Sequence, residues 1–425
     1  MRMNFLKARC AGLVRLLVAL VFLHGMGNQA MAGTPCAGPQ RLCASVDTNT
    51  SAPPRADLVR AVSFMRTAAA LDDPAIQPKP PAPAQAALPT DTAPATIRIA
   101  LLLPMRSGTL ATAAESVRAG FMAGMERDGT GFKVDVVATG DAPREVLDAY
   151  ARAAAASDIV VGPLARSAVT ALADSDAVTR PTVVLSVPEG HAAVPRLMLV
   201  AGLSIEDEAT QVAEWAAREH PHGRALVLTG SAAWAHRAAG AFETRWKQLG
   251  HTSQRFAIPS GAAGKAAIDE LRQKLDIDPP DLLFAALDGT ELRPVRASTG
   301  TALPCYGGGA ANPGRGTDPG AAELDGVRIL DLPWIVLPDH PAVMVYPRPV
   351  NTEQPLDMDR LYALGIDAFR VARELILGAG APFGMDGVTG RLDVGPGPGG
   401  QPQLRRREAA VVVRNGGFEP VDRDR

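Results

Sequence analysis

The segment IRIALLL at residues 97–103 limits the possible folds more than any other part of this chain. It lacks the polar alternation of a half-exposed strand, so both of its faces should be covered, as in a central parallel strand between helices. A loop follows at 104–108, and Ala113, Val117 and Phe121 then recur at helical spacing. The segment predicts a strand, a loop and a helix of an open α/β sheet, and such loops are where these sheets bind ligands.

The same alternation of strands and helices continues along most of the chain. Further strands are predicted near 133–138, 158–161, 182–186, 196–200, 224–229, 255–258 and 281–286. Two such series within 425 residues predict an α/β protein with two doubly wound α/β lobes and a central cleft.

We expect this domain to span 96–423. The first lobe should comprise about 96–203 and 327–386, and the second about 204–326 and 387–423. The glycine- and proline-rich stretch 302–320 is expected to cross between the lobes. A strong helix is expected at 359–377, because Leu364, Ala372 and Leu375 share one helical face.

The amino-terminal residues resemble an export signal. Basic residues precede the apolar run LLVALVFL at 16–23, and Ala30, Met31 and Ala32 form a small-x-small cleavage site. A membrane anchor is the alternative, but this run is far shorter than the roughly 20 residues that span a bilayer. We expect a cleavable signal peptide at 1–32 and a periplasmic protein. A proline- and alanine-rich linker at 33–95 should follow.

The cysteines fit an oxidising compartment. Cys36 and Cys43 are close enough in sequence to close a small disulfide after export. Cys305 has no neighbouring base or cation, so we expect a buried apolar side chain rather than a reactive thiol. The residues before Cys36 do not form a lipobox, which favours a soluble protein and leaves outer-membrane association as the alternative.

The composition and motifs exclude several classes of protein. A net charge of -2 and an aromatic content of 4% give no reason to expect nucleic-acid binding. The chain lacks G-x-S-x-G, S-x-x-K and H-E-x-x-H, and its glycine runs lack the context of a nucleotide loop. Ser107, Ser167 and Ser186 have no nearby base, so hydrogen-bonding roles at strand ends are expected. We therefore expect no enzyme, metal site or cofactor.

Several blocks resemble known proteins. The blocks IRIALLLPMRSGTLATAAESVRAGFMAG, SDIVVGPLARSAVTALA and TVVLS resemble the first lobe of type 1 periplasmic binding proteins of the branched-chain amino-acid, or leucine-binding-protein-like, class. Later blocks, LDGVRILDLPWIV, RLYALGIDAFRVAREL and VTGRLDV, resemble more narrowly the penicillin-binding protein activator family of the LppC/LpoA type. The resemblance covers about 96–421. It implies a non-enzymatic regulator that stimulates a bifunctional peptidoglycan synthase, that is, a penicillin-binding protein.

The resemblance also indicates residues of the cleft. In the amino-acid receptors, the turns after the third and fourth strands hold the ligand carboxylate, and they correspond here to Arg166–Ser167 and to Ser186–Glu189. Glu189 has the wrong charge for that role, and Arg166 could offset it.

Trp234 and Asp288 of the second lobe should face the same cleft, and Asp288 could take a ligand amine. For each of these residues, a contact between lobes or a surface position is the alternative. Two functions remain open at this point. One is the activator, and the other is a soluble receptor for an amino acid or small peptide that serves a transporter.

Overall fold

The structure is a computed structural model that describes residues 96–190, 194–314, 320–349 and 354–422. The expected signal peptide, the linker at 33–95 and the Cys36–Cys43 disulfide lie outside these residues. Among the residues described, no helix has both the length and the apolar character that a bilayer crossing requires.

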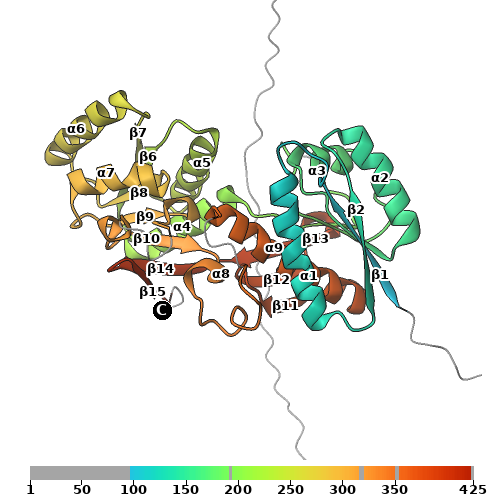
Figure 1. Cartoon of the computed structure of the whole chain (residues 1–425). Coiled ribbons are helices and arrows are strands. Elements are labelled where there is room, and N and C mark those ends of the chain that lie inside the picture. Colours follow the sequence, from blue (N-terminus) through green and yellow to red (C-terminus); the bar gives the residue numbers. More distant parts are fainter. Residues whose placement is uncertain (1–95, 191–193, 315–319, 350–353, 423–425) are drawn as a thin grey trace, which may run out of the picture. The chain divides into compact units, whose positions relative to one another are not determined.

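The first lobe is built on a five-stranded parallel sheet (Figure 1). Its strands, in the order β2-β1-β3-β4-β5, are Phe132–Ala138, Ile97–Leu103, Ile159–Val161, Thr182–Val184 and Met198–Val200. Helices α1 (Ala111–Asp128) and α9 (Leu356–Leu377) cover one face, and α2 (Pro143–Ala156) and α3 (Arg166–Ala173) cover the other.

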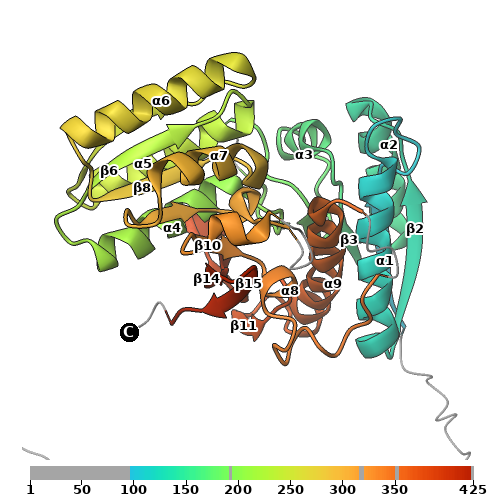
Figure 2. The ribbon, with the colours of Figure 1, turned by 60° about the vertical axis from the view of Figure 1, so that its left-hand side comes forward.

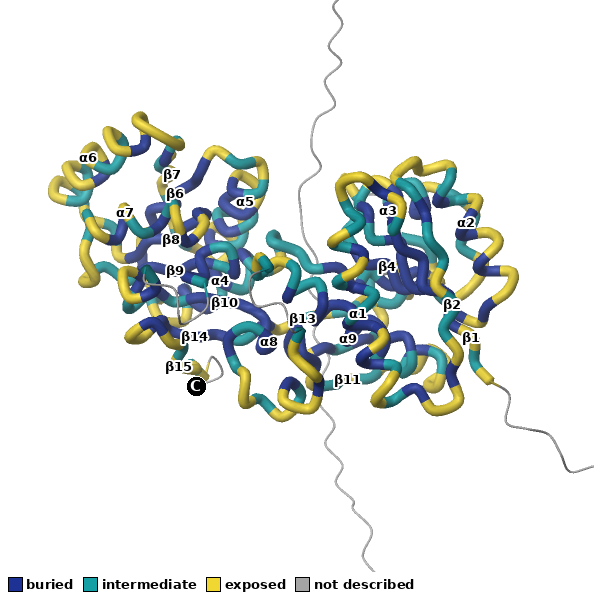
Figure 3. Tube along the Cα trace, in the orientation of Figure 1, coloured by how far each residue is buried: buried dark blue, intermediate teal, exposed yellow. Residues whose placement is uncertain are grey.

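Strand β1 has two buried faces. Leu101 packs in the core shared with α1 and α9, and Leu102 packs in the core shared with α2 and α3. Both side chains are fully buried. In Figure 3 the exposed residues gather on outer helices such as α6, and the buried ones on inner strands such as β4 and β10. The prediction of a central strand covered on each side is confirmed.

The second lobe is built on a seven-stranded sheet. Its order is β15-β14-β10-β9-β8-β6-β7, with bounds Gly417–Pro420, Ala409–Arg414, Arg328–Asp331, Cys305–Gly307, Leu282–Ala286, Arg224–Thr229 and Thr252–Ala257. Helices α4 (Ile205–Glu219) and α5 (Ala233–Gln248) pack on one face, and α6 (Ala262–Ile277) and α7 (Gly289–Thr299) pack on the other. The expected doubly wound second lobe is therefore present.

A small antiparallel sheet completes the first lobe. Its strands are β11 (Phe383–Asp386), β12 (Arg391–Pro396) and β13 (Pro402–Arg407). Leu392 and Val394 of β12 pack in the same core as Leu101 of β1. Short helices occur at α8 (Pro333–Val336), η1 (Gly309–Ala311), η2 (Ala321–Leu324) and η3 (Pro398–Gly400).

The expected lobe boundaries need correction at two places. Segment 328–331 was expected in the first lobe, but β10 pairs with β9 and β14 in the second sheet. Segment 387–407 was expected in the second lobe, but β12 packs on the first-lobe core. The described residues 302–314 of the glycine-rich stretch do not cross between lobes, because β9 pairs with β8 inside the second sheet.

The chain passes between the lobes at three other places. These crossings lie between β5 and α4 at 201–204, between β10 and α8 at Leu332, and between β13 and β14 at Glu408. Each crossing is only one to four residues long by these bounds. Each crossing therefore keeps residues of the two lobes close together.

Candidate functional site

A cleft of about 900 Å³ lies between the lobes, at the carboxyl ends of the second sheet's strands. The second lobe contributes the start of α4, Trp234 of α5, the start of α7 and the loop after β9. The beginning of α9 and the crossing residues Leu332 and Glu408 also line the cleft. In this sheet β6 lies between β7 and β8, so the strand order reverses there, which is where an open α/β sheet places a ligand.

Trp234 and Asp288 both line this cleft, because they follow β6 and β8 at that point of reversal. Trp234 is half-buried. Asp288 caps α7: its Oδ1 accepts a hydrogen bond from the backbone N–H of Glu291 at 2.8 Å, and Glu291 returns a bond to the Asp288 N–H. One carboxylate oxygen of Asp288 is thus already occupied by the fold.

Ser107 does not line the cleft. Its hydroxyl is buried and accepts hydrogen bonds from the backbone N–H groups of Thr109 and Leu110, at 3.1 and 2.8 Å. These bonds order the turn that leads into α1. The role is the hydrogen-bonding one expected for a serine at a strand end.

The other first-lobe candidates also lie outside the lining of the cleft. Arg166 begins α3 and is half-buried, whereas Ser167 is exposed. Ser186 is half-buried and Glu189 is exposed. The backbone N–H of Glu189 donates to Thr170 Oγ1 at 2.7 Å, which holds this loop against α3 instead of turning it to the cleft.

The floor of the cleft is an ion pair that the sequence analysis missed. Asp331, at the end of β10, is 1% exposed. Arg360 of α9 donates to both of its oxygens, from Nε at 3.1 Å and from Nη2 at 2.7 Å. Asn312 and the backbone N–H of Leu332 donate to the same carboxylate at 2.9 and 2.8 Å. Four donors of the protein therefore surround this carboxylate.

The Arg360 guanidinium makes two further contacts. Its Nη2 donates to the carbonyl oxygen of Gly309 at 2.7 Å, and its Nη1 donates to Asp357 at 2.7 Å. Burial alone would lower the pKa of Arg360, but the charge and hydrogen bonds of Asp331 outweigh it and leave the pKa raised. Arg360 is thus a permanent cation between α9 and the second lobe.

Glu208 of α4 lies next to this pair. Its Oε1 accepts a hydrogen bond from the backbone N–H of Gly309 at 2.9 Å. Burial, followed by the negative charges of Glu408 and Asp331, raises its pKa well above the ordinary value, although Arg360 opposes the shift. The floor of the cleft is therefore rich in negative charge and holds its own guanidinium.

A second buried network joins two of the crossings. Arg406 of β13 donates to the carbonyl oxygens of Ala201 and Gly202, at 2.7 and 2.9 Å, and to Thr389 Oγ1 at 3.1 Å. Thr389 in turn donates to Asp367 of α9 at 2.6 Å. Burial lowers the pKa of Arg406. Residues from three distant parts of the chain meet here to hold the crossing strands together.

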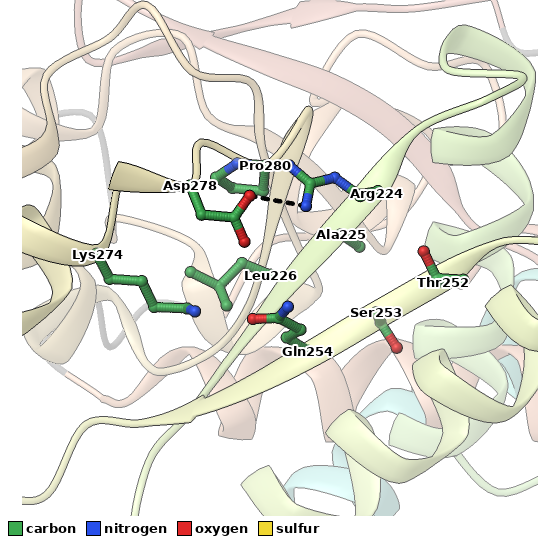
Figure 4. A pocket seen from close by; sticks show the side chains of 9 residues that line it. All are labelled: Arg224, Ala225, Leu226, Thr252, Ser253, Gln254, Lys274, Asp278 and Pro280. Atoms are coloured by element: carbon green, nitrogen blue, oxygen red, sulfur yellow. Dashed lines mark hydrogen bonds and ion pairs between the residues drawn. The ribbon is translucent and has the colours of Figure 1, made fainter. Parts of the chain in front are cut away.

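Other hollows lie away from the cleft. One of about 280 Å³, between β13 and the loop after β4, is lined by Pro188, Asp207 and Arg406 among others. Another, of about 170 Å³, lies at the amino ends of β6 and β7 (Figure 4). Its Arg224 donates to Asp278 at 2.8 Å, so this cation already has a partner. No group of His, Cys, Asp and Glu in the part of the chain that the structure describes is arranged to hold a metal ion.

Comparisons with known proteins agree with this architecture. Residues 81–259 match the family described as "LppC putative lipoprotein". A penicillin-binding protein activator LpoA from Haemophilus ducreyi is 25% identical over 332 residues, which are 76% of this chain and 54% of that protein. The chain is thus similar to the LpoA-type family of periplasmic-binding-protein-like proteins.

Solved structures place this chain in the type 1 periplasmic-binding-protein fold. The C-domain of LpoA from Haemophilus influenzae, described as a regulator of PBP1A, has a TM-score of 0.60 at 20% identity, covering 76% of this chain and 100% of that one. A "putative branched-chain amino acid ABC transporter" from Chromobacterium violaceum has a TM-score of 0.61 at 33% identity, covering 74% and 99%. The chain spans about half the length of the curated LpoA relatives it matches.

The sequence offered a weak signal for the missed residues. Asp331 is a charged residue at the end of an otherwise buried strand, and such a residue needs a partner. Arg360 is 29 residues further along the chain, and nothing in the spacing shows that its helix begins beside that strand end.

Proposed function

We propose that this chain is a non-enzymatic periplasmic regulator that activates a bifunctional penicillin-binding protein in peptidoglycan synthesis. Its likeness to curated activators over 76% of its length is the observation that carries the proposal. The penicillin-binding protein is its partner, and no cofactor takes part.

The charge of the cleft supports a regulator over an amino-acid receptor. Four helices begin at the cleft, and a helix amino terminus attracts anions such as a ligand carboxylate. Three of these termini already carry acidic residues: Glu206, Asp207 and Glu208 on α4, Glu291 on α7, and Asp357 and Asp359 on α9. The first turn of α5 carries none. At three of the four termini a ligand carboxylate would therefore meet negative charge where it would need positive charge.

The alternative is a soluble receptor for an amino acid or small peptide serving a transporter. The 33% identity to the Chromobacterium violaceum protein favours it, since that protein is described as part of an amino-acid transporter. In that case Asp288 and Trp234, which line the cleft, would contact the ligand. Ser167 and Arg166 would have to approach it by closure of the first lobe.

A thermal-shift screen of the common amino acids separates the two functions. A receptor saturated at a hundredfold excess over its Kd gains about 3 kcal/mol, which raises its Tm by several degrees. We expect no rise. A rise with one amino acid that disappears when Asp288→Ala and Ser167→Ala are combined would favour the receptor.

The positive test is reconstitution with a purified bifunctional synthase. We expect the mature chain to bind the synthase and to raise its rate of glycan polymerisation or peptide cross-linking. Asp288→Ala should leave this stimulation unchanged, because the proposal gives the cleft no ligand. Failure to bind any bifunctional synthase from the same cell would contradict the proposal.

The absence of catalysis and the location are tested separately. Purified protein should not cleave peptidoglycan or peptide esters, and turnover abolished by Ser107→Ala or Ser167→Ala would contradict this. Mass spectrometry of the mature protein should show an amino terminus at Gly33. An acylated cysteine at that terminus would instead show a lipoprotein.

A further inference from the structure

The two lobes are joined by more than the three crossing strands. Arg360 belongs to α9, which packs on the sheet of the first lobe. Its side chain reaches the Gly309 carbonyl and the Asp331 carboxylate, which both belong to the second lobe. Short crossings of this kind act as hinges that allow lobes to rotate, so any side chain that spans the cleft opposes that rotation.

The contact geometry is tight and specific. The guanidinium contacts both Asp331 oxygens, and this paired geometry tolerates little displacement. A Cβ added at Gly309 would lie 3.1 Å from Asp331 and 3.2 Å from Arg360, so glycine allows the three groups to meet. The Arg360 side chain is 15% exposed, and the Asp331 side chain is 1% exposed.

Opening the cleft would move α9 away from the loop at Gly309. The Gly309 carbonyl would lose its bond to Arg360, and Asp331 would lose the cation that balances a buried charge. Such a loss is costly because Asp331 stays in the second sheet, where its neighbours Asn312 and Leu332 carry no charge. The closed arrangement is favoured without any molecule in the cleft.

We propose that Arg360 is an internal latch that holds the two lobes together across the cleft floor, in the role that a ligand has in a two-lobed receptor. A ligand stabilises closure by contacting both lobes at once. Here one side chain of the protein makes the same bridge. The latch does not depend on the proposed function, since it concerns only the lobe-to-lobe distance of the free protein.

The test measures that distance between spin labels on the two lobes. Ser167→Cys on α3 and His236→Cys on α5 give exposed label positions. In the full chain, Cys10, Cys36 and Cys43 are replaced by serine, and Cys305 stays because it is fully buried. We expect one narrow distance distribution for the parent chain. Arg360→Met should add a longer-distance population of about a tenth of the molecules or more.

The matched control is Arg370→Met. Arg370 is on the same helix, is similarly buried, with 21% side-chain exposure, and pairs with Asp367 inside the first lobe. Arg370→Met should leave the distance distribution unchanged. A narrow, unshifted distribution in folded Arg360→Met would overturn the latch, as would an equal change in Arg370→Met.

Circular dichroism and a thermal scan show whether each variant folds. Should Arg360→Met fail to fold, Arg360→Lys decides the question. Lysine keeps the charge but cannot contact both Asp331 oxygens and the Gly309 carbonyl together. For Arg360→Lys we expect a longer-distance population smaller than the one expected for Arg360→Met. If Arg360→Lys shows no longer-distance population, the proposal is overturned.

Discussion

Gly120 of α1 and Gly365 of α9 lie in one helix crossing, where each packs against the backbone of the opposite helix. A Cβ at Gly120 would overlap the carbonyl of Tyr362, and a Cβ at Gly365 would overlap the carbonyl of Val117. Figure 2 shows the two helices side by side along much of their length. The pair of glycines sets the distance of α9 from α1, and α9 carries Arg360 to the cleft.

Gly365→Ala should destabilise the protein by about 1–3 kcal/mol, because a methyl group is forced into closely packed backbone. Urea unfolding of the full chain measures this. Gly240→Ala is the control: Gly240 lies within α5, and a Cβ there would meet nothing within 4 Å. That change should stabilise by about 0.5–1 kcal/mol. Equal effects of the two substitutions would refute the close approach of the helices.

Glu208→Gln should stabilise the protein at pH 8 more than at pH 5. The pKa of Glu208 is raised in the folded state by burial and by Glu408 and Asp331, so the folded protein holds this proton more tightly than the unfolded chain. The contribution of Glu208 to stability therefore falls as pH rises from about 4.5 through its folded-state pKa. Glutamine keeps an acceptor for the Gly309 N–H and removes the charge.

Urea unfolding at pH 5 and pH 8 gives the difference between Glu208→Gln and the parent chain. The control, Glu214→Gln, removes a carboxylate of the same helix that pairs with Arg245 at the surface. It should destabilise by at most about 1 kcal/mol at either pH. If the difference in unfolding free energy between Glu208→Gln and the parent chain does not grow from pH 5 to pH 8, the charged form of Glu208 does not destabilise the folded protein.

Asp367→Asn should cost about 2–4 kcal/mol of stability. The carboxylate is 1% exposed and accepts hydrogen bonds from the backbone N–H groups of Val388 and Thr389, at 3.1 and 2.7 Å. An amide would point one of its own N–H groups at these donors. Denaturant unfolding measures the loss. The control is Asp386→Asn, which changes an exposed partner of Arg391 and should cost less than about 1 kcal/mol. Equal losses for the two variants would argue against Asp367 as a buried acceptor that stabilises the fold.

Cys305 should be unreactive in the folded protein. Burial raises the pKa of its thiol to about 11, and the side chain is fully buried in the second lobe. In a chain with Cys10, Cys36 and Cys43 changed to serine, a thiol reagent at pH 8 should react at least about a hundredfold more slowly than in guanidinium chloride. Comparable rates in the two conditions would mean that the thiol is accessible.

The sequence by itself determined the class of the fold. The unbroken apolar run at Ile97–Leu103 requires cover on both faces, and the repeated alternation of strands and helices leaves few arrangements other than two doubly wound lobes. Periodicity and local chain order are enough for such inferences. The resemblance to the amino-acid receptors, and not periodicity, indicated Trp234 and Asp288 as cleft residues, and both line the cleft.

Only the tertiary structure decided which charges meet. Glu208, Arg360 and Glu408 are far apart in the chain and look in sequence like any surface charge, and the sequence around Asp331 does not show which cation it meets. Their burial follows from where the crossings lie. From the sequence, the glycine-rich stretch that contains β9 was expected to cross between the lobes and β10 was expected in the first lobe, but the two strands pair in the second sheet. Local patterns report which face of an element is apolar. The partner of a buried charge depends on how distant elements pack, and no local pattern contains that information.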